Sequence, residues 1–85
     1  MFAVLSSVKS AKDSRMRRRQ IGAAIRRRRE ALALSQEELA EAIDCHRNYV
    51  GLVERGEHNV SIEMIARFAE AFKCRASDII REAGY

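Results

Sequence analysis

Apolar residues recur every three or four positions along most of the chain, which is the spacing of an amphipathic helix. The pattern predicts helices over residues 14–33, 35–43, 46–55 and 76–83, with a further helix that begins at Ser61 and repeats to Phe72. The chain has no proline and only four glycines, so few residues interrupt these helices. We therefore predict an all-α domain of five helices over residues 14–85. Residues 1–13 have weak periodicity and are predicted to be a flexible tail.

Local signals mark several helix ends and an inward face. Ser35 with Glu38 three residues later is a capping box, Ser14 and Ser61 are candidate N-caps, and Gly56 is a candidate C-cap. The inward positions predict a core of Ile21, Ile25, Leu32, Leu39, Ile43, Val50, Val53, Ile65, Phe68, Phe72 and Ile79.

Charge is distributed unevenly along the 85 residues, whose formal net charge is +4. Residues 1–33 carry ten Lys or Arg and two acids, whereas residues 34–85 carry six basic and ten acidic residues. An anionic partner should therefore meet the first third of the chain, with nucleic acid the first candidate and an anionic membrane the second. RNA is disfavoured because an aromatic content of 6% offers no stacking face.

The candidate reactive side chains do not form a catalytic or metal-binding pattern. Cys45 and Cys74 sit in apolar contexts, and with His46 and His58 they show no metal-ligand spacing. Cys45 adjoins His46, but no third group is evident to orient the histidine, so we expect no enzyme, metal or cofactor. The N-terminal apolar stretch is too short for a secretion signal, and no segment approaches the ~20 apolar residues of a membrane span. We expect a cytoplasmic protein with no membrane partner.

Residues 36–55 have the arrangement that a helix-turn-helix requires. Two short helices are joined at Asp44, and the small Ala40 lies where they must cross closely. The apolar positions of this segment are Leu39, Ile43, Cys45, Val50 and Val53.

These residues resemble a known family. SQEELAEAI at 35–43 and VERG at 53–56 are similar to the lambda-repressor-like, or XRE, regulators, over roughly residues 21–80. HRNYVGLVERGEHNVSI at 46–62 also resembles the controller proteins of restriction-modification systems. The resemblance implies a five-helix bundle, a symmetric dimer, a palindromic operator, a phosphate contact by Gln36 and an internal ion pair between Arg29 and Glu54. Four positions depart from the family pattern: Arg28 replaces Leu, Ala33 and Asp44 replace Gly, and His46 replaces a Ser or Thr cap.

The DNA-contacting residues are predicted from the faces of the helix over 46–55. Val50 and Val53 point inward, so Arg47 and Asn48 are exposed in its first turn, where they can read guanine and adenine. Tyr49 is an equal candidate for a phosphate contact or for packing. The full predicted set is Gln36, His46, Arg47, Asn48, Tyr49, Gly51, Leu52, Arg55, His58 and Asn59. The arginines at 17–19 and 26–29 are more often a solvated face than phosphate contacts.

The sequence thus predicts a regulator that binds double-stranded DNA at a palindromic operator, with a restriction-modification operon as one candidate target. Apolar residues left over from the core, Ile62, Met64, Ile80 and Tyr85, predict a homodimer interface in residues 61–85. No separate ligand domain is evident, so no small-molecule ligand is expected. The alternative is an antitoxin-like interaction module, which would need an additional partner-binding segment, and only residues 1–13 offer one.

Overall fold

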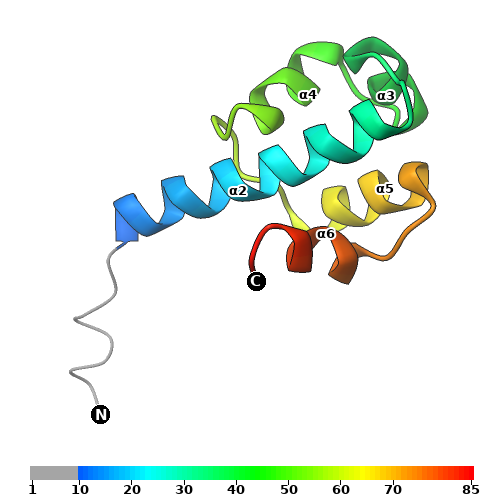
Figure 1. Cartoon of the computed structure of the whole chain (residues 1–85). Coiled ribbons are helices and arrows are strands. Elements are labelled where there is room, and N and C mark those ends of the chain that lie inside the picture. The colour runs from blue at the N-terminus through cyan, green and yellow to red at the C-terminus, as the bar shows by residue number, and fades with distance from the viewer. Residues whose placement is uncertain (1–9) are drawn as a thin grey trace.

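The computed structural model describes the backbone of residues 10–85 and the side chains of residues 13–85. Residues 1–9 of the predicted tail over residues 1–13 lie outside this part. The described residues form five helices, labelled in Figure 1: α2 (Ser10–Ala31), α3 (Gln36–Ala42), α4 (Arg47–Glu54), α5 (Ile62–Phe72) and α6 (Ala76–Glu82). The all-α prediction is confirmed, and the last four helices agree with the predicted ranges to within one residue at each end.

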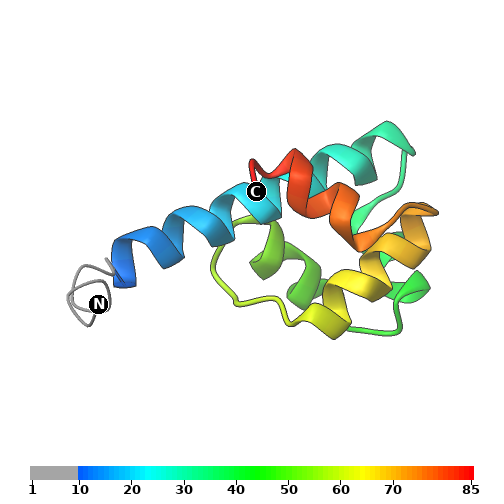
Figure 2. The ribbon, with the colours of Figure 1, turned by 90° about the horizontal axis from the view of Figure 1, so that it is seen from below.

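The first helix differs from its prediction at both ends. Helix α2 begins at Ser10, so Ser14 lies inside the helix and is not its cap, and residues 10–13 are helical. Their periodicity is weak because this end of α2 projects beyond the bundle (Figures 1 and 2) and has no neighbour on which to pack an apolar stripe. At the other end, α2 stops at Ala31, two residues earlier than predicted.

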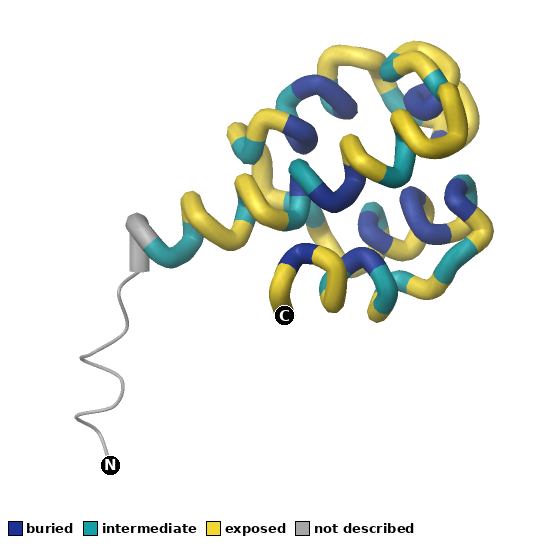
Figure 3. The backbone as a smooth tube through the Cα atoms, in the orientation of Figure 1, coloured by how far each residue is buried: buried dark blue, intermediate teal, exposed yellow. Residues whose placement is uncertain are grey.

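Helix α2 runs through the middle of the bundle, with α3 and α4 on one side and α5 and α6 on the other (Figure 1). The buried positions face this centre (Figure 3). The core consists of Ala24, Ile25, Leu39, Ala40, Ile43, Val50, Val53, Ile65, Phe68, Ala69, Phe72, Ile79 and Ala83. Ile21 is half-buried against this cluster. The predicted core is therefore confirmed at every position except Leu32, whose side chain is 50% exposed because the chain leaves the helix at that point.

Side-chain caps define where the helices begin. The Ser35 hydroxyl accepts a hydrogen bond from the Glu38 amide at 2.9 Å, and the Glu38 carboxylate accepts one from the Ser35 amide at 2.8 Å. The Ser61 hydroxyl accepts a hydrogen bond from the Met64 amide at 3.1 Å at the start of α5, and Nδ1 of His46 accepts one from the Asn48 amide, also at 3.1 Å. The capping box at Ser35 is thus confirmed, and His46 performs the capping role of the Ser or Thr that it replaces.

Within residues 10–85, left-handed backbone conformations occur at three residues other than glycine, Ala33 (φ 57°), Asp44 (φ 56°) and Lys73 (φ 58°). Asp tolerates this conformation better than most residues, whereas Ala33 has no side-chain group to compensate for the cost of about 1–2 kcal/mol. The junction after α2 therefore keeps the left-handed geometry that glycine favours, although glycine is absent.

Replacing Ala33 by glycine is expected to stabilise the protein by about 0.5–1 kcal/mol, because the relief of strain exceeds the added chain entropy of the unfolded state. This corresponds to a rise of about 2–8 °C in the melting temperature. The matched control is Ala31→Gly, at the helical end of α2, which should lower stability instead. Equal effects of the two substitutions would show that residue 33 is not left-handed in solution.

Candidate nucleic-acid interface

The turn between α3 and α4 sets the angle of the second helix. Asp44 adopts its left-handed conformation there, and the Cys45 amide donates a hydrogen bond to the Ala40 carbonyl at 2.9 Å. Ala40 is buried, so its small side chain permits the close approach of the two helices. Val50 and Val53 are fully buried beneath α4. The opposite face of α4 is therefore directed away from the bundle.

Polar side chains gather on this outer face. A shallow groove is lined by Gln36 from α3 and by Arg47, Asn48, Gly51, Leu52 and Arg55 from α4 and its C-cap. Arg47, Asn48 and Arg55 are exposed, and Leu52 is half-buried. The structure thus brings together the residues that helical periodicity assigned to one face. Arg47 and Asn48, at the start of α4, are exposed and can contact a partner that binds on this face.

Gly51 does not lie open on this face as the sequence prediction had it. It is buried, and the ends of the Gln36 and Arg55 side chains lie close to it. A Cβ atom added at Gly51 would lie 3.1 Å from Nη1 of Arg55 and 3.7 Å from Oε1 of Gln36. Both are ends of flexible side chains, which could move aside for a larger residue or for a bound partner.

A hydrogen-bonded network lies beneath the groove and centres on Glu54, whose side chain is 3% exposed. Nε and Nη2 of Arg29 donate hydrogen bonds to the two carboxylate oxygens of Glu54, at 2.6 and 3.1 Å. Gln36 donates its amide to the same carboxylate at 3.0 Å, and Nη1 of Arg29 donates to the Leu34 carbonyl at 2.8 Å. The hydrogen bonds to Glu54 raise the pKa of Arg29. The internal ion pair that the family resemblance implied is present, and it joins α2, α3 and α4.

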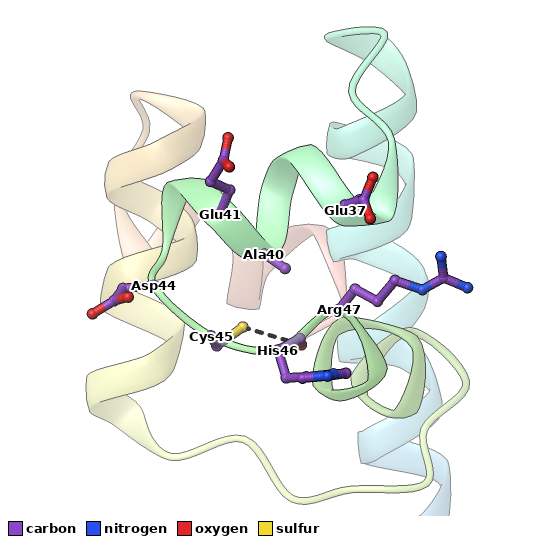
Figure 4. A pocket seen from close by; sticks show the side chains of 7 residues that line it. All are labelled: Glu37, Ala40, Glu41, Asp44, Cys45, His46 and Arg47. Atoms are coloured by element: carbon purple, nitrogen blue, oxygen red, sulfur yellow. Dashed lines mark hydrogen bonds between the residues drawn. The ribbon is translucent and has the colours of Figure 1, made fainter.

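An acidic surface borders the turn on its other side. Glu37, Glu41 and Asp44 line a second shallow groove with Ala40, Cys45, His46 and Arg47 (Figure 4). The Arg47 side chain extends away from Glu41 and Asp44 in this view. Because carboxylates repel phosphates, this groove is less favourable to an anionic partner than the groove formed by Gln36 and the outer face of α4.

The cysteine and histidine at the turn do not form a reactive pair. The Cys45 thiol donates to the backbone carbonyl of His46 at 3.5 Å, and burial, with Asp44 nearby, raises its pKa. The thiol is therefore held in its protonated, poorly nucleophilic form. Among residues 13–85, no group of three His, Cys, Asp or Glu side chains is arranged to hold a metal ion.

Three further predicted contacts are Tyr49, in the first turn of α4, and His58 and Asn59, in the loop after it. Tyr49 is half-buried, stacks on Phe68 with centroids 6.5 Å apart and meets the edge of His58 at 5.2 Å. Burial raises the pKa of Tyr49, which favours a packing role for this residue. His58 and Asn59 are exposed in the loop after α4, and Asn59 accepts a hydrogen bond from Arg18 of α2 at 3.4 Å.

The residues predicted to form a dimer interface differ in exposure. Ile62 and Tyr85 are 83% and 56% exposed, whereas Met64 and Ile80 are half-buried. The Tyr85 hydroxyl donates a hydrogen bond to the side chain of Gln20 on α2. The exposed apolar area at these four positions is therefore contributed mainly by Ile62 and Tyr85.

Sequence reasoning missed three contacts that position the interface. Gly22 lets α2 approach the last carbonyls of α4, Arg18 contacts the loop after α4, and Arg28 forms a bidentate ion pair with Glu82 at 2.9 and 2.5 Å. Arg28, which replaces the Leu of the family pattern, thus ties α2 to α6 by charge. The signal for the first contact was a glycine in the middle of a helix, where it is costly without a packing reason.

Comparison with known proteins identifies the family. The helix-turn-helix family HTH_3 matches residues 25–79. The control protein C.BamHI of Bacillus amyloliquefaciens is 38% identical over 47 residues, which are 55% of this chain and 58% of that protein. The control protein C.SmaI of Serratia marcescens is 39% identical over 51 residues, which are 60% of this chain and 61% of that protein. The matches thus span less than two thirds of these relatives.

Solved structures agree with this assignment. The clp gene regulator ClgR of Corynebacterium glutamicum superimposes with a TM-score of 0.77 and 34% identity, over 80% of this chain and 87% of that one. The restriction-modification controller protein C.AhdI of Aeromonas hydrophila superimposes with a TM-score of 0.71 and 39% identity, over 73% of this chain and 94% of that one. No helix in the described part of this chain is long and apolar enough to cross a membrane. The sequence-based resemblance to XRE regulators and controller proteins is confirmed.

Proposed function

The chain belongs to the HTH_3 helix-turn-helix family, and on that premise we propose that it binds a specific duplex DNA sequence and regulates transcription there. The observation that carries the proposal is the location of Arg47 and Asn48 side by side in the sequence on the outer face of α4. Both side chains are exposed in the first turn of α4, and both line the groove that α4 forms with α3. The first turn of the second helix is the part of this motif that meets base edges in the major groove.

The chemistry of the groove suits base reading. Arg47 presents a planar fork of donors that matches O6 and N7 of guanine, and the Asn48 amide matches N6 and N7 of adenine. Leu52, one turn further along, offers an apolar contact to a thymine methyl group. Gln36 lies at the first turn of α3, where its amide can turn from Glu54 to a phosphate.

The operator should be palindromic, because the protein should act as a homodimer through Ile62, Met64, Ile80 and Tyr85. A two-fold axis at this end of the bundle would place the two α4 helices in successive major grooves, about 34–36 Å apart. The similarity to control proteins makes a restriction-modification operon the first candidate target.

Selection of bound sites from random duplexes tests the DNA-binding function. We expect a palindromic consensus whose half-sites are centred about 10–10.5 base pairs, or a multiple, apart. Enrichment of no consensus would contradict sequence-specific binding, and a consensus without symmetry would contradict the dimer.

Replacing Ile80 by aspartate is expected to abolish dimerisation, because it places a charge among the apolar groups of the interface. Sedimentation at micromolar concentration should show a wild-type dimer and a monomeric variant that still binds half-sites weakly. Ala42→Asp, which adds the same charge at an exposed position of α3, should leave the dimer intact. A monomeric wild type, or an Ile80→Asp protein that dimerises normally, would place the interface elsewhere or rule it out.

A further inference from the structure

We infer that Arg15, Arg18 and Arg19 of α2 form a second DNA-contacting surface, which binds the phosphate backbone beside the groove that α4 enters. We call these three residues the arginine row. The inference rests on the proposed function, because it adds a sequence-independent contact to the site that reads the bases.

The arginine row lies on the face of α2 that is turned toward α4. Gly22 marks this face, because a Cβ atom there would strike the Val53 carbonyl oxygen and lie 2.8 Å from that of Glu54. Arg18 lies four residues before Gly22, and Arg19 lies three before it. Arg15 in turn lies three residues before Arg18 and four before Arg19. Residues at these spacings share one face of a helix. The face that contacts α4 therefore continues past the C-terminal end of α4 as arginines.

The row is physically continuous with the end of the predicted recognition helix. Nε of Arg18 donates to the Gly56 carbonyl at 3.4 Å, and its Nη1 donates to Oδ1 of Asn59, also at 3.4 Å. Arg19 lies directly under Gly56, where an added Cβ atom would be 2.8 Å from the Arg19 Cα. The loop after α4 thus rests on the row, and α2 projects beyond this loop (Figures 1 and 2).

The depth of the major groove brings phosphates to the level of α2. The groove is about 8.5 Å deep, and packed helices lie about 8–10 Å apart. When α4 contacts the base edges at the floor of the groove, α2 lies behind it at roughly the height of the phosphate rim. Past the end of α4, the arginine row contacts the short loop through Gly56 and Asn59. Long guanidinium side chains can cover the remaining distance.

The charge of this segment has no internal counterpart. Arg15 and Arg19 are exposed, and no ion pair within the described residues involves them or Arg18. By contrast, Arg26 pairs with Glu30 and Arg55 pairs with Glu57. Like charges four residues apart destabilise a helix slightly, so phosphates would relieve this repulsion.

Duplex DNA fits the row better than an anionic membrane does. A helix that binds at a membrane surface buries an apolar face opposite its basic one. Among the described side chains of this projecting segment, residues 13–20, Met16 is the one large apolar group. The segment therefore offers charge without the apolar area that membrane binding needs.

The test is the salt dependence of DNA binding by the double variant Arg15→Gln/Arg19→Gln. Arg18 is kept because it contacts the loop. Affinity is measured at several salt concentrations on a duplex obtained by selection and on a random duplex of equal length. The slope of log affinity against log salt should become shallower by about 1.8, at about 0.9 for each lost phosphate contact, on both duplexes alike. Arg67→Gln/Lys73→Gln removes the same charge from two exposed positions, in the middle of α5 and at its C-cap, and should leave the slope unchanged.

Several results would overturn the inference. One is a slope equal to that of the wild type, and another is an equal change in the Arg67→Gln/Lys73→Gln control. A loss confined to the selected duplex would mean that the arginines read bases. Unchanged DNA binding with lost binding to vesicles rich in anionic lipid would assign the row to membranes. If selection returns no consensus, the proposed function fails, yet the slope on the random duplex still decides whether the row binds phosphate.

Discussion

Replacing Gly22 by alanine is expected to destabilise the protein by about 3 kcal/mol or more, near the upper end of the cost of overpacking a core. The new methyl group would lie 2.8 Å from the Glu54 carbonyl oxygen and even closer to that of Val53. Both obstacles are backbone atoms of α4, so no side chain can rotate away to relieve the clash. Helices α2 and α4 would have to separate, and the melting temperature should fall by more than about 12 °C.

Gly51→Ala is the matched control, since it makes the same chemical change in another helix. The atoms nearest to its added methyl group belong to the flexible Arg55 and Gln36 side chains. Helix propensity should then dominate and stabilise the protein by up to ~1 kcal/mol. Similar losses for Gly22→Ala and Gly51→Ala would show that the tight contact between α2 and α4 does not exist in solution.

Replacing Glu54 by alanine is expected to cost about 3–5 kcal/mol, because it strands the charge of Arg29 in a poorly solvated position. The Arg29 side chain is only 12% exposed, and both of its hydrogen bonds to Glu54 would be lost. Gln36 would lose its hydrogen-bond acceptor as well. Urea unfolding should show a lower midpoint with little change in slope.

The comparison variant is Glu57→Ala, which removes a carboxylate from an ion pair whose side chains are 58% and 56% exposed. Exposed pairs contribute about 0–1 kcal/mol, so its unfolding midpoint should stay near that of the wild type. A Glu54→Ala protein as stable as Glu57→Ala would mean that solvent reaches the network around Glu54.

The helices and their caps could be predicted from the sequence because their determinants are local. Ser35 and Glu38 form a capping box within a single turn, and Ser61 caps α5 through an amide three residues away. Leu32 was misassigned because its spacing fits the inward face, whereas α2 already ends at Ala31 and the left-handed Ala33 turns the chain away. The projecting end of α2 was missed because a helix without a packing partner has no apolar stripe.

The outer face of α4 could also be predicted, since two buried valines fix the orientation of an eight-residue helix. The covering of Gly51 and the hydrogen bond from Gln36 to Glu54 could not. Both depend on side chains that meet across different helices, at sequence separations that periodicity does not encode. For the same reason, the position of Gly22 against the end of α4 became evident only in three dimensions.

If the first turn of α4 reads bases, Arg47→Ala should weaken the binding of two duplexes unequally. One duplex carries the selected consensus, and the other is a random sequence of equal length. Arg47→Ala should lose about 1–3 kcal/mol of binding free energy on the consensus, with relaxed preference at one base position in each half-site, and much less on the random duplex. Equal losses on both duplexes would contradict base reading by Arg47, because this residue would then contribute only charge.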